Sequence, residues 1–269
     1  MKKYKSLFAI ASLLILSISN VNAQTHKPLS EEELLKKKSY TSLVDAFENP
    51  KEVYMLYLTY RDFLSVPEEI LKFVNIQYLS LEGNFIEYLP PELANLKNLQ
   101  FINLSQNPRL YIRQSISVLE QLPNLKSLSL SGNVIYKIPA EIGNLKGLQL
   151  LDLKDNHIYE IPDKIGNLKS LRILFLSNNR LRSLPPDIGD MRSLQVFDLS
   201  NNRLNTLPKE IGGMRNLREL NLNNNILKKI PYHILKLNKI EIINLRNNPD
   251  INHQKHKINA LLPNAKIRM

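Results

Sequence analysis

Apolar and polar residues alternate in short stretches that recur along the chain. Residues 194–204 read LQVFDLSNNRL, and close variants of this string begin at residues 148, 171 and 217. In each variant, apolar residues take every second position before a polar break that contains asparagine. This is the pattern of a short strand with one buried face. Similar strings at a fixed spacing indicate a repeat architecture.

An apolar residue marks the start of every repeat. These residues are Val53, Ile76, Leu99, Leu125, Leu148, Leu171, Leu194, Leu217 and Ile240. Seven of the eight intervals between them are 23 residues long, and the interval from Leu99 to Leu125 is 26. A single unit of this length cannot bury its own apolar side chains, so the repeats must stack and share a continuous core.

A proline follows an apolar residue on the arm that returns from each strand. These prolines are Pro67, Pro90, Pro139, Pro162, Pro185, Pro208 and Pro231. Proline fixes φ and has no backbone donor, so we expect this arm to be loop or a single helical turn rather than sheet. The sequence therefore predicts an α/β solenoid of about nine repeats. Its parallel strands should line a concave face, and its loops and short helical turns should lie on the convex face.

The repeat at residues 107–124 lacks the proline element and has three extra residues. Ile112, Ile116 and Leu119 stand at helical spacing in it. We expect a longer helix there, with Tyr111 near its start.

Each repeat also places an asparagine where the predicted strand ends. These are Asn84, Asn107, Asn133, Asn156, Asn179, Asn202, Asn225 and Asn248. A sharp turn at this point leaves backbone donors and acceptors inside the stack, and an amide side chain can satisfy both kinds. We therefore expect a structural ladder of asparagines. Arg61 takes the corresponding place in the first repeat.

The two ends of the repeat array, residues 53–248, depart from the pattern because a solenoid must cover its terminal cores. Residues 24–52 contain Ser30 followed three positions later by Glu33, a capping box, and apolar residues at roughly helical spacing. We expect one N-terminal capping helix that leads into the first strand. Residues 249–269 should form the C-terminal cap, a short helix that ends in an extended segment.

The first 23 residues have the pattern of an export signal. A lysine-rich start, an apolar run from Leu7 to Ile18 and small residues before Ala23 predict a signal peptide cleaved near Ala23. A membrane anchor is the alternative, but the run is shorter than the roughly 20 apolar residues that span a bilayer. We expect a secreted, periplasmic or cell-surface protein with no transmembrane segment in the mature chain. The chain has no cysteine, so this fold must be stable without disulfides.

The repeat unit, LxxLxLxxNxLxxIPxxIGxLxx, resembles that of the leucine-rich-repeat family, and the resemblance covers essentially the whole mature chain. Together with the signal peptide, it is similar to exported bacterial leucine-rich-repeat proteins of the 23-residue type. The returning arm also resembles the Ras-group repeats of intracellular eukaryotic proteins, a setting that the signal peptide argues against. The resemblance implies a non-enzymatic module that binds a protein partner through its concave face.

The third and fifth positions of each repeat are left free on the predicted concave face. The candidate partner-binding residues at these positions are Tyr57, Tyr78, Phe101, Leu150, Asp152, Ile173, Phe175, Val196, Asp198 and Glu219. Nothing in the repeat requires an apolar column there, so we expect an exposed apolar patch with polar neighbours that binds a protein. The alternative is that aromatic and branched residues only favour the strand conformation.

Positive charge offers a second hypothesis. The chain carries a net charge of +11, and cleavage would remove Lys2, Lys3 and Lys5 to leave 11 − 3 = +8. Five basic residues follow the asparagines in neighbouring repeats and should share one flank: Arg180, Arg182, Arg203, Lys228 and Lys229. This flank could bind anionic glycans or a host surface, or it could be an ordinary solvated edge. We expect no nucleic-acid partner, because basic and aromatic residues are not interleaved on the concave face.

Catalytic chemistry has little support in the sequence. The histidines at positions 26, 157, 233, 253 and 256 lie in predicted loops or caps, outside any nucleophile or metal motif. His253 and His256, near Asp250, could bind a metal weakly, but solvated cap residues are the simpler interpretation. The chain also has no glycine-rich phosphate loop. We therefore expect no enzyme activity, no metal and no cofactor.

Overall fold

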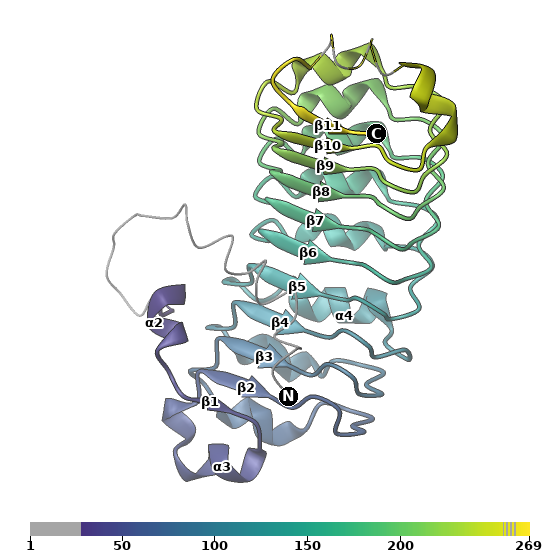
Figure 1. Ribbon diagram of the computed structural model, residues 1–269. Coiled ribbons are helices and arrows are strands. Elements are labelled where there is room, and N and C mark those ends of the chain that lie inside the picture. Colours follow the sequence, from purple (N-terminus) through teal and green to yellow (C-terminus); the bar gives the residue numbers. More distant parts are fainter. Residues whose placement is uncertain (1–27, 255, 257, 259, 261) are drawn as a thin grey trace. The chain divides into compact units, whose positions relative to one another are not determined.

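The computed structural model describes residues 28–254, 256, 258, 260 and 262–269, so the predicted signal peptide at residues 1–23 lies outside the described residues. The chain separates into two compact units. The N-terminal unit comprises residues 1–133 and 147–150, and the C-terminal unit comprises residues 134–146 and 151–269. Figure 1 labels the strands β1 to β11 and the helices α2, α3 and α4.

The N-terminal unit contains short parallel strands that follow one another in chain order. Its strands are β1 (Ser39–Tyr40), β2 (Met55–Tyr57), β3 (Tyr78–Ser80), β4 (Phe101–Asn103) and β5 (Ser127–Ser129). Its helices are α2 (Glu31–Leu35), α3 (Leu43–Glu48), α4 (Ile112–Leu119) and the 3-10 helices η2 (Pro50–Glu52), η3 (Glu68–Lys72) and η4 (Pro91–Asn95). Strands pair at equal repeat positions, so Tyr78 lies opposite Phe101.

The C-terminal unit repeats this arrangement. Its strands are β7 (Ile173–Phe175), β8 (Val196–Asp198), β9 (Glu219–Asn221), β10 (Ile242–Asn244) and β11 (Lys266–Arg268), while β6 (Leu150–Asp152) contains the boundary between the units. Its 3-10 helices are η5 (Ala140–Asn144), η6 (Asp163–Asn167), η7 (Pro186–Asp190), η8 (Lys209–Gly213), η9 (Tyr232–Lys236) and η10 (Pro249–Gln254). The strands β7 to β11 are parallel and in chain order.

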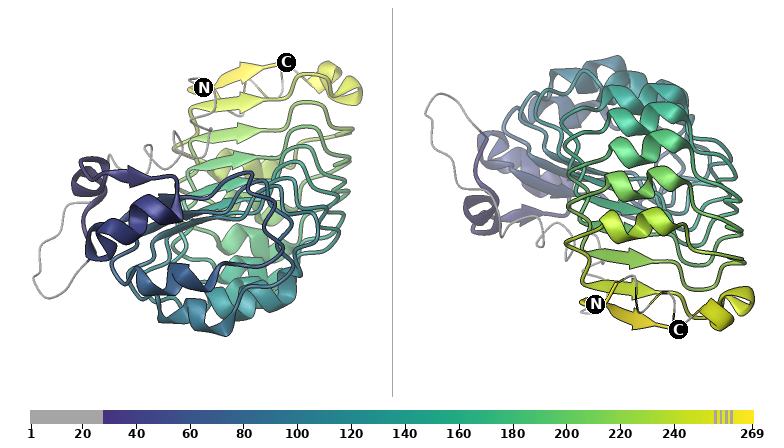
Figure 2. Two further views of the ribbon diagram at one scale, coloured as in Figure 1. Left: turned by 90° about the horizontal axis from the view of Figure 1, so that it is seen from below. Right: turned by 90° about the horizontal axis from the view of Figure 1, so that it is seen from above.

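Proline starts the short helix of the returning arm. All seven prolines singled out in the sequence are N-caps of 3-10 helices, with φ between −58° and −71°. In the C-terminal unit, successive short helices pack on one another on the side away from the strands (Figure 2). The predicted solenoid of parallel strands and short helical turns is therefore confirmed in both units.

Alternation along each strand separates the core from the surface. In β8, Phe197 points inward and is 1% exposed, whereas Val196 and Asp198 are half-buried. Leu199 and Leu204 of the same repeat are fully buried. The core thus lies between the strands and the short helices, as the period of two predicts.

Each asparagine at the end of a strand satisfies backbone groups inside the stack. The amide nitrogen of Asn202 donates to the carbonyls of Leu176, Leu199 and Ser200 at 2.9, 3.1 and 3.2 Å. Its carbonyl oxygen accepts the backbone N–H of Leu181 at 3.0 Å. Asn84, Asn107, Asn179, Asn225 and Asn248 make equivalent donor and acceptor contacts. These bonds link each repeat to its neighbours within a unit.

The residue before each ladder position has a left-handed backbone. These residues are Tyr60, Gly83, Gln106, Gly132, Asp155, Asn178, Asn201, Asn224 and Asn247, with φ between 53° and 70°. Glycine, asparagine and aspartate tolerate this conformation best, and they occupy seven of the nine places. The paired asparagines therefore have different tasks: the first makes the turn and the second satisfies the buried backbone.

The two caps and the irregular repeat test the remaining fold predictions. The helix α4, with Tyr111 as its N-cap residue, confirms the predicted helix at residues 107–124. The single capping helix expected at residues 24–52 is wrong, because the structure has α2 and α3 with β1 between them. Ser30 forms the predicted capping box with Glu33, and Ser42 caps a second start at α3. In the C-terminal cap, β11 confirms the extended segment, while the expected helix falls partly on residues outside the described set.

We expect Asn202→Ala to lower the free energy of unfolding by about 1–3 kcal/mol, because the buried Leu181 amide and three carbonyls would lose this partner. Urea unfolding of the full chain measures this change. Asn205→Ala, at an exposed position of the same repeat, is the control and should leave the midpoint unchanged. Equal midpoints for Asn202→Ala and the native chain would contradict a stabilising ladder.

Candidate functional site

The third and fifth repeat positions lie on the strand face opposite the core, but they differ widely in exposure. Glu219 is exposed, and the half-buried residues are Tyr57, Tyr78, Phe175, Val196 and Asp198. The buried residues are Phe101, Leu150, Asp152 and Ile173, which are at most 4% exposed. The expectation of a continuous exposed apolar column is therefore wrong at Phe101, Leu150 and Ile173. In-register strands stand about 4.8 Å apart, so neighbouring side chains in one row cover each other.

An aromatic row crosses β2, β3 and β4 in the N-terminal unit. The ring centroids of Tyr57 and Tyr78 are 4.9 Å apart, and those of Tyr78 and Phe101 are 6.1 Å apart. Phe101 also packs in a buried cluster with Met55 and with Leu34 of α2. Burial raises the pKa of both tyrosine hydroxyls, so the row is uncharged at neutral pH.

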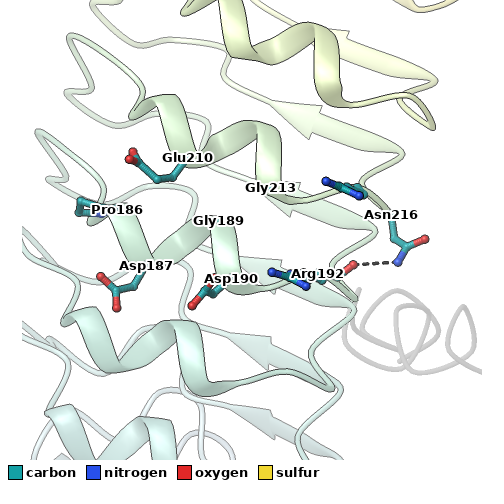
Figure 3. A pocket seen from close by; sticks show the side chains of 9 residues that line it. Pro186, Asp187, Gly189, Asp190, Arg192, Glu210, Gly213 and Asn216 are labelled. Atoms are coloured by element: carbon teal, nitrogen blue, oxygen red, sulfur yellow. Dashed lines mark hydrogen bonds between the residues drawn. The ribbon is translucent and has the colours of Figure 1, made fainter.

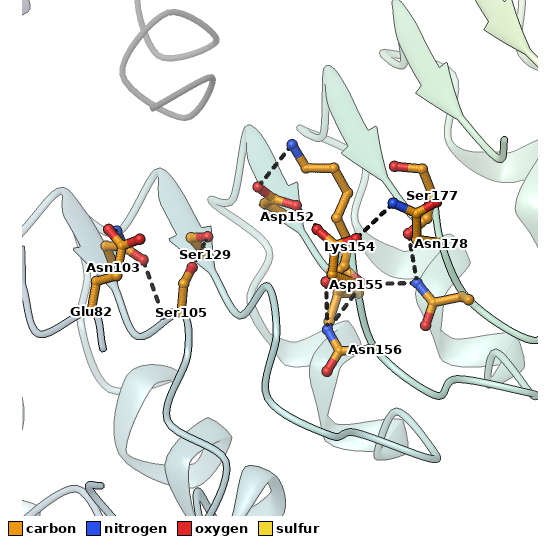
Figure 4. Close-up of polar contacts among 12 residues, drawn as sticks. Glu82, Asn103, Ser105, Ser129, Asp152, Lys154, Asp155, Asn156, Ser177 and Asn178 are labelled. Carbon is orange, nitrogen blue, oxygen red and sulfur yellow. Dashed lines mark hydrogen bonds and ion pairs between the residues drawn. The ribbon is translucent and has the colours of Figure 1, made fainter. Parts of the chain in front are cut away.

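Polar side chains continue this strand face beside the aromatic row. Asn103 donates to the Glu82 carboxylate at 3.0 Å, and the hydroxyls of Ser105 and Ser129 are 2.6 Å apart. Burial raises the pKa of Glu82, and hydrogen bonds from Asn103 and Tyr60 partly oppose this shift. Figure 4 shows these side chains along successive strands. The polar part of the face is thus already internally hydrogen-bonded.

A cation, a carboxylate and an aromatic ring meet on the strand face of the C-terminal unit. The Lys154 ammonium lies 3.4 Å from the Asp152 carboxylate, as Figure 4 shows. It also lies 4.6 Å from the centroid of the Phe175 ring. Asp152 is 3% exposed and also accepts the backbone N–H of Lys154 at 3.1 Å. Desolvation raises the pKa of Asp152, although Lys154 opposes this shift. The Lys154 ammonium thus lies over the Phe175 ring, which remains half-exposed.

The strands that follow carry polar groups beside Phe175. Asp198 accepts both the backbone N–H and the hydroxyl of Ser200, at 3.0 and 2.7 Å. Glu219 is exposed, and Val196 pairs with it directly across β8 and β9. The C-terminal unit therefore presents an apolar centre, Phe175 and Val196, with acidic groups along one side.

The five basic residues of the predicted flank are all exposed: Arg180, Arg182, Arg203, Lys228 and Lys229. A second backbone ladder aligns their repeats, because the N–H of Arg180 bonds to Ile158, that of Arg203 to Leu181 and that of Lys228 to Asn205. None of the five makes an ion pair with another described residue. Sequence reasoning missed that Tyr136 and Tyr159, 52% and 46% exposed, stand in this same ladder.

A shallow cavity of about 600 Å³ lies on the helical side of the C-terminal unit, away from the strands, between η7 and η8 (Figure 3). Its charged residues are Asp187, Asp190, Glu210, Arg192 and Arg215. The amide of Asn216 donates to the Arg192 carbonyl at 2.8 Å. Carboxylates and guanidinium groups thus share this open depression.

Two of the described histidines have rings that pack against tyrosines. The His157 ring packs against Tyr136, with centroids 5.3 Å apart, and His233 packs against Tyr232. Among the residues that the structure describes, no group of three or more acidic or histidine side chains could hold a metal ion. The side chain of His253 is outside the described set. No helix in the described part of the chain has the length and hydropathy to cross a bilayer.

The chain belongs to the leucine-rich-repeat family. The family model described as a leucine-rich repeat region matches residues 109–179 and 163–262, together more than half of the 269 residues. A single leucine-rich-repeat model matches residues 75–96. Disease resistance protein UNI of Arabidopsis thaliana is 38% identical over 73 residues, 27% of this chain and 8% of that protein. Disease resistance protein RFL1 of the same plant is 42% identical over 60 residues, 22% of this chain and 7% of that protein. The chain thus spans less than a tenth of the length of these two relatives.

Solved structures share the fold over most of the chain. An internalin from Listeria monocytogenes has a TM-score of 0.65 at 22% identity, covering 82% of this chain and 62% of its own. The ectodomain of the Arabidopsis receptor kinase GASSHO1/SCHENGEN3, solved with Casparian strip integrity factor 2, has a TM-score of 0.57 at 28% identity, covering 80% and 29%. The plant peptide hormone receptor RGFR1, solved with RGF2, has a TM-score of 0.54 at 27% identity, covering 79% and 39%.

Asp152 should make stability depend on pH. Because burial raises the pKa of its carboxyl, the folded chain holds this proton to a higher pH than the unfolded chain does. Its contribution is therefore fully present below the unfolded pKa of about 3.9 and declines as pH rises through the folded pKa. We expect urea midpoints of Asp152→Asn to decline less over this range than those of the native chain. Parallel pH profiles would contradict the assignment.

Proposed function

We propose that this leucine-rich-repeat chain is an exported, non-enzymatic module that binds a protein partner through its strand face. The observation that carries the proposal is the half-exposed apolar pair Phe175 and Val196, with Asp198 and Glu219 beside it. A fold whose core is complete has no structural need for such a pair on its surface. An aromatic anchor with polar neighbours is the usual composition of a protein-binding hot spot.

The comparisons support a protein partner. Two relatives of the fold above 25% identity are plant receptors solved with a partner, Casparian strip integrity factor 2 in one and RGF2 in the other. Those partners belong to those receptors. What they support for this chain is recognition of a protein or peptide by a preformed repeat surface.

The proposed binding surface contains fewer exposed residues than the sequence predicted. Tyr57 and Tyr78 extend it in the N-terminal unit, while Phe101, Leu150, Asp152 and Ile173 contribute as buried support. In the C-terminal unit, Lys154 fixes Phe175 through its contact with the ring. A ring that is already positioned loses little conformational entropy on binding.

Export and a bacterial source are further parts of the proposal. The first 23 residues support secretion or a periplasmic or cell-surface location, with cleavage near Ala23. The 23-residue repeat resembles that of exported bacterial proteins. We expect the mature chain to begin after residue 23 when it is recovered from the envelope or medium, and N-terminal sequencing measures this directly.

We expect Phe175→Ala to weaken partner binding about tenfold or more, because it removes the apolar anchor. Cross-linked capture from extracellular and envelope proteins would compare the native chain, Phe175→Ala and Tyr232→Ala. Tyr232 is 65% exposed on η9, so its variant is a matched control for an aromatic side chain lost elsewhere. A protein retained by the native chain and Tyr232→Ala but lost by folded Phe175→Ala supports the proposal. Equal capture by all three contradicts it.

A second candidate function is attachment to anionic glycans through the basic flank. The observation that favours it is that all five bases are exposed without an ion pair to any other described residue. Arginine suits this task because its guanidinium binds a carboxylate or sulfate with two hydrogen bonds. The half-exposed rings of Tyr136 and Tyr159 could stack on sugar faces beside the arginines.

We expect the native chain to bind immobilised dextran sulfate, but not dextran, and to elute as salt screens the charges. The double change Arg180→Gln and Arg203→Gln should elute at clearly lower salt. Arg192→Gln with Arg215→Gln, exposed arginines outside the flank, is the control for lost net charge. Equal elution of both variants would contradict a specific flank.

A further inference from the structure

A segment of the chain lies on the strand face of the N-terminal unit. Leu34 of α2 is 4% exposed and packs in one cluster with Met55 and Phe101, which are 7% and 3% exposed. Leu35, the next residue, is 60% exposed. One leucine of the pair is therefore inserted against the strand-face residues while the other faces solvent.

A polar contact fixes the same segment. The buried amide of Gln100 donates to the backbone carbonyl of Leu29 at 3.1 Å and to the side chain of Gln77 at 2.8 Å. Gln77 and Gln100 are 3% and 1% exposed. The strand face thus holds this segment as an interface holds a peptide, through one apolar side chain and one backbone carbonyl.

The repeat core does not need this cover. Leu56 and Ile102, the inward neighbours of Met55 and Phe101, are fully buried on the other side of the strands. The end of the stack is closed by other elements, since β1 pairs with β2 and Phe47 of α3 packs on Phe73 with centroids 5.3 Å apart. The helix α2 therefore adds burial only on the face that would meet a partner.

We propose that residues 28–35 occupy, in cis, a peptide-binding site on the strand face of the N-terminal unit. The partner that fits this site is a short helical turn that presents a leucine to Met55 and Phe101 and a backbone carbonyl to Gln100. This inference rests on the proposed function, because it names the partner chemistry of the strand face. One leucine and one hydrogen bond make a weak cover, which a partner with more contacts displaces.

Oxidation of Met55 by hydrogen peroxide tests the cover without a known partner. We expect Met55 in full-length Leu34→Asp to oxidise several-fold faster than in the native chain. Leu35→Asp, which changes the exposed neighbour in the same way, should match the native rate. Met191 and Met214, fully buried in the C-terminal unit, and a urea midpoint report whether the variant remains folded. Mass spectrometry of the peptides resolves each methionine.

Two outcomes would overturn the cover. An unchanged Met55 rate in folded Leu34→Asp means that Leu34 does not shield the site. A lowered urea midpoint together with faster oxidation at all three methionines means that the segment is an integral part of the fold.

A peptide added in trans tests the partner chemistry. The peptide of residues 28–38 contains no methionine and, at the millimolar effective concentration typical of a short tether, should slow Met55 oxidation in Leu34→Asp. The same peptide with Leu34→Asp should have no effect. If both peptides slow Met55 oxidation equally, or if neither slows it, a partner that presents a leucine is contradicted. These results are independent of capture through Phe175. Faster Met55 oxidation in Leu34→Asp, together with unchanged partner capture by Phe175→Ala, would therefore contradict the proposed function. It would not contradict the role of residues 28–35 as a cover.

Discussion

The sharp turn at the end of every strand buries backbone amides and carbonyls that the sheet cannot pair, and the rest of the structure depends on satisfying them. Asn202 does so with one side chain, bonding to carbonyls of its own repeat and of the repeat before it. An unpaired buried group would cost about 1–3 kcal/mol, and the turn recurs in each repeat. A side chain that is both donor and acceptor is therefore required at this place.

Register follows from this constraint. Because each ladder asparagine ties its repeat to the previous one at the same position, side chains at equal positions form rows within a unit, as in the pairing of Val196 with Glu219. Each repeat contributes one side chain to a row, so the chemistry of the row can change from repeat to repeat without disturbing the core. The N-terminal unit uses its row for aromatic packing, and the C-terminal unit places a cation and acidic groups around Phe175.

The strand face is therefore covered in one unit and partly exposed in the other, although the strands have the same geometry. In the N-terminal unit, α2 covers the face and Phe101 is buried. In the C-terminal unit, Phe175 stays half-exposed, and its contact with Lys154 orients the ring without hiding it. The basic residues of the flank lie elsewhere, on a second ladder of backbone hydrogen bonds outside the strands. The apolar surface and the basic flank thus occupy different rows of one repeat.

Periodicity was sufficient to predict the strands, the proline-started turns, the helix α4 and the asparagines at the turns, because each answers a local requirement that recurs every repeat. The left-handed residue before each asparagine was not predicted, although asparagine, aspartate and glycine recur at that place in the sequence. Exposure was not predictable in this way. Phe101 and Phe175 occupy strand-face positions in equivalent strands, yet one is buried beneath Leu34, a residue far away in the chain. Burial depends on which side chains stand beside a residue in its row and on what packs against the row from elsewhere in the chain, and only the tertiary structure decides both.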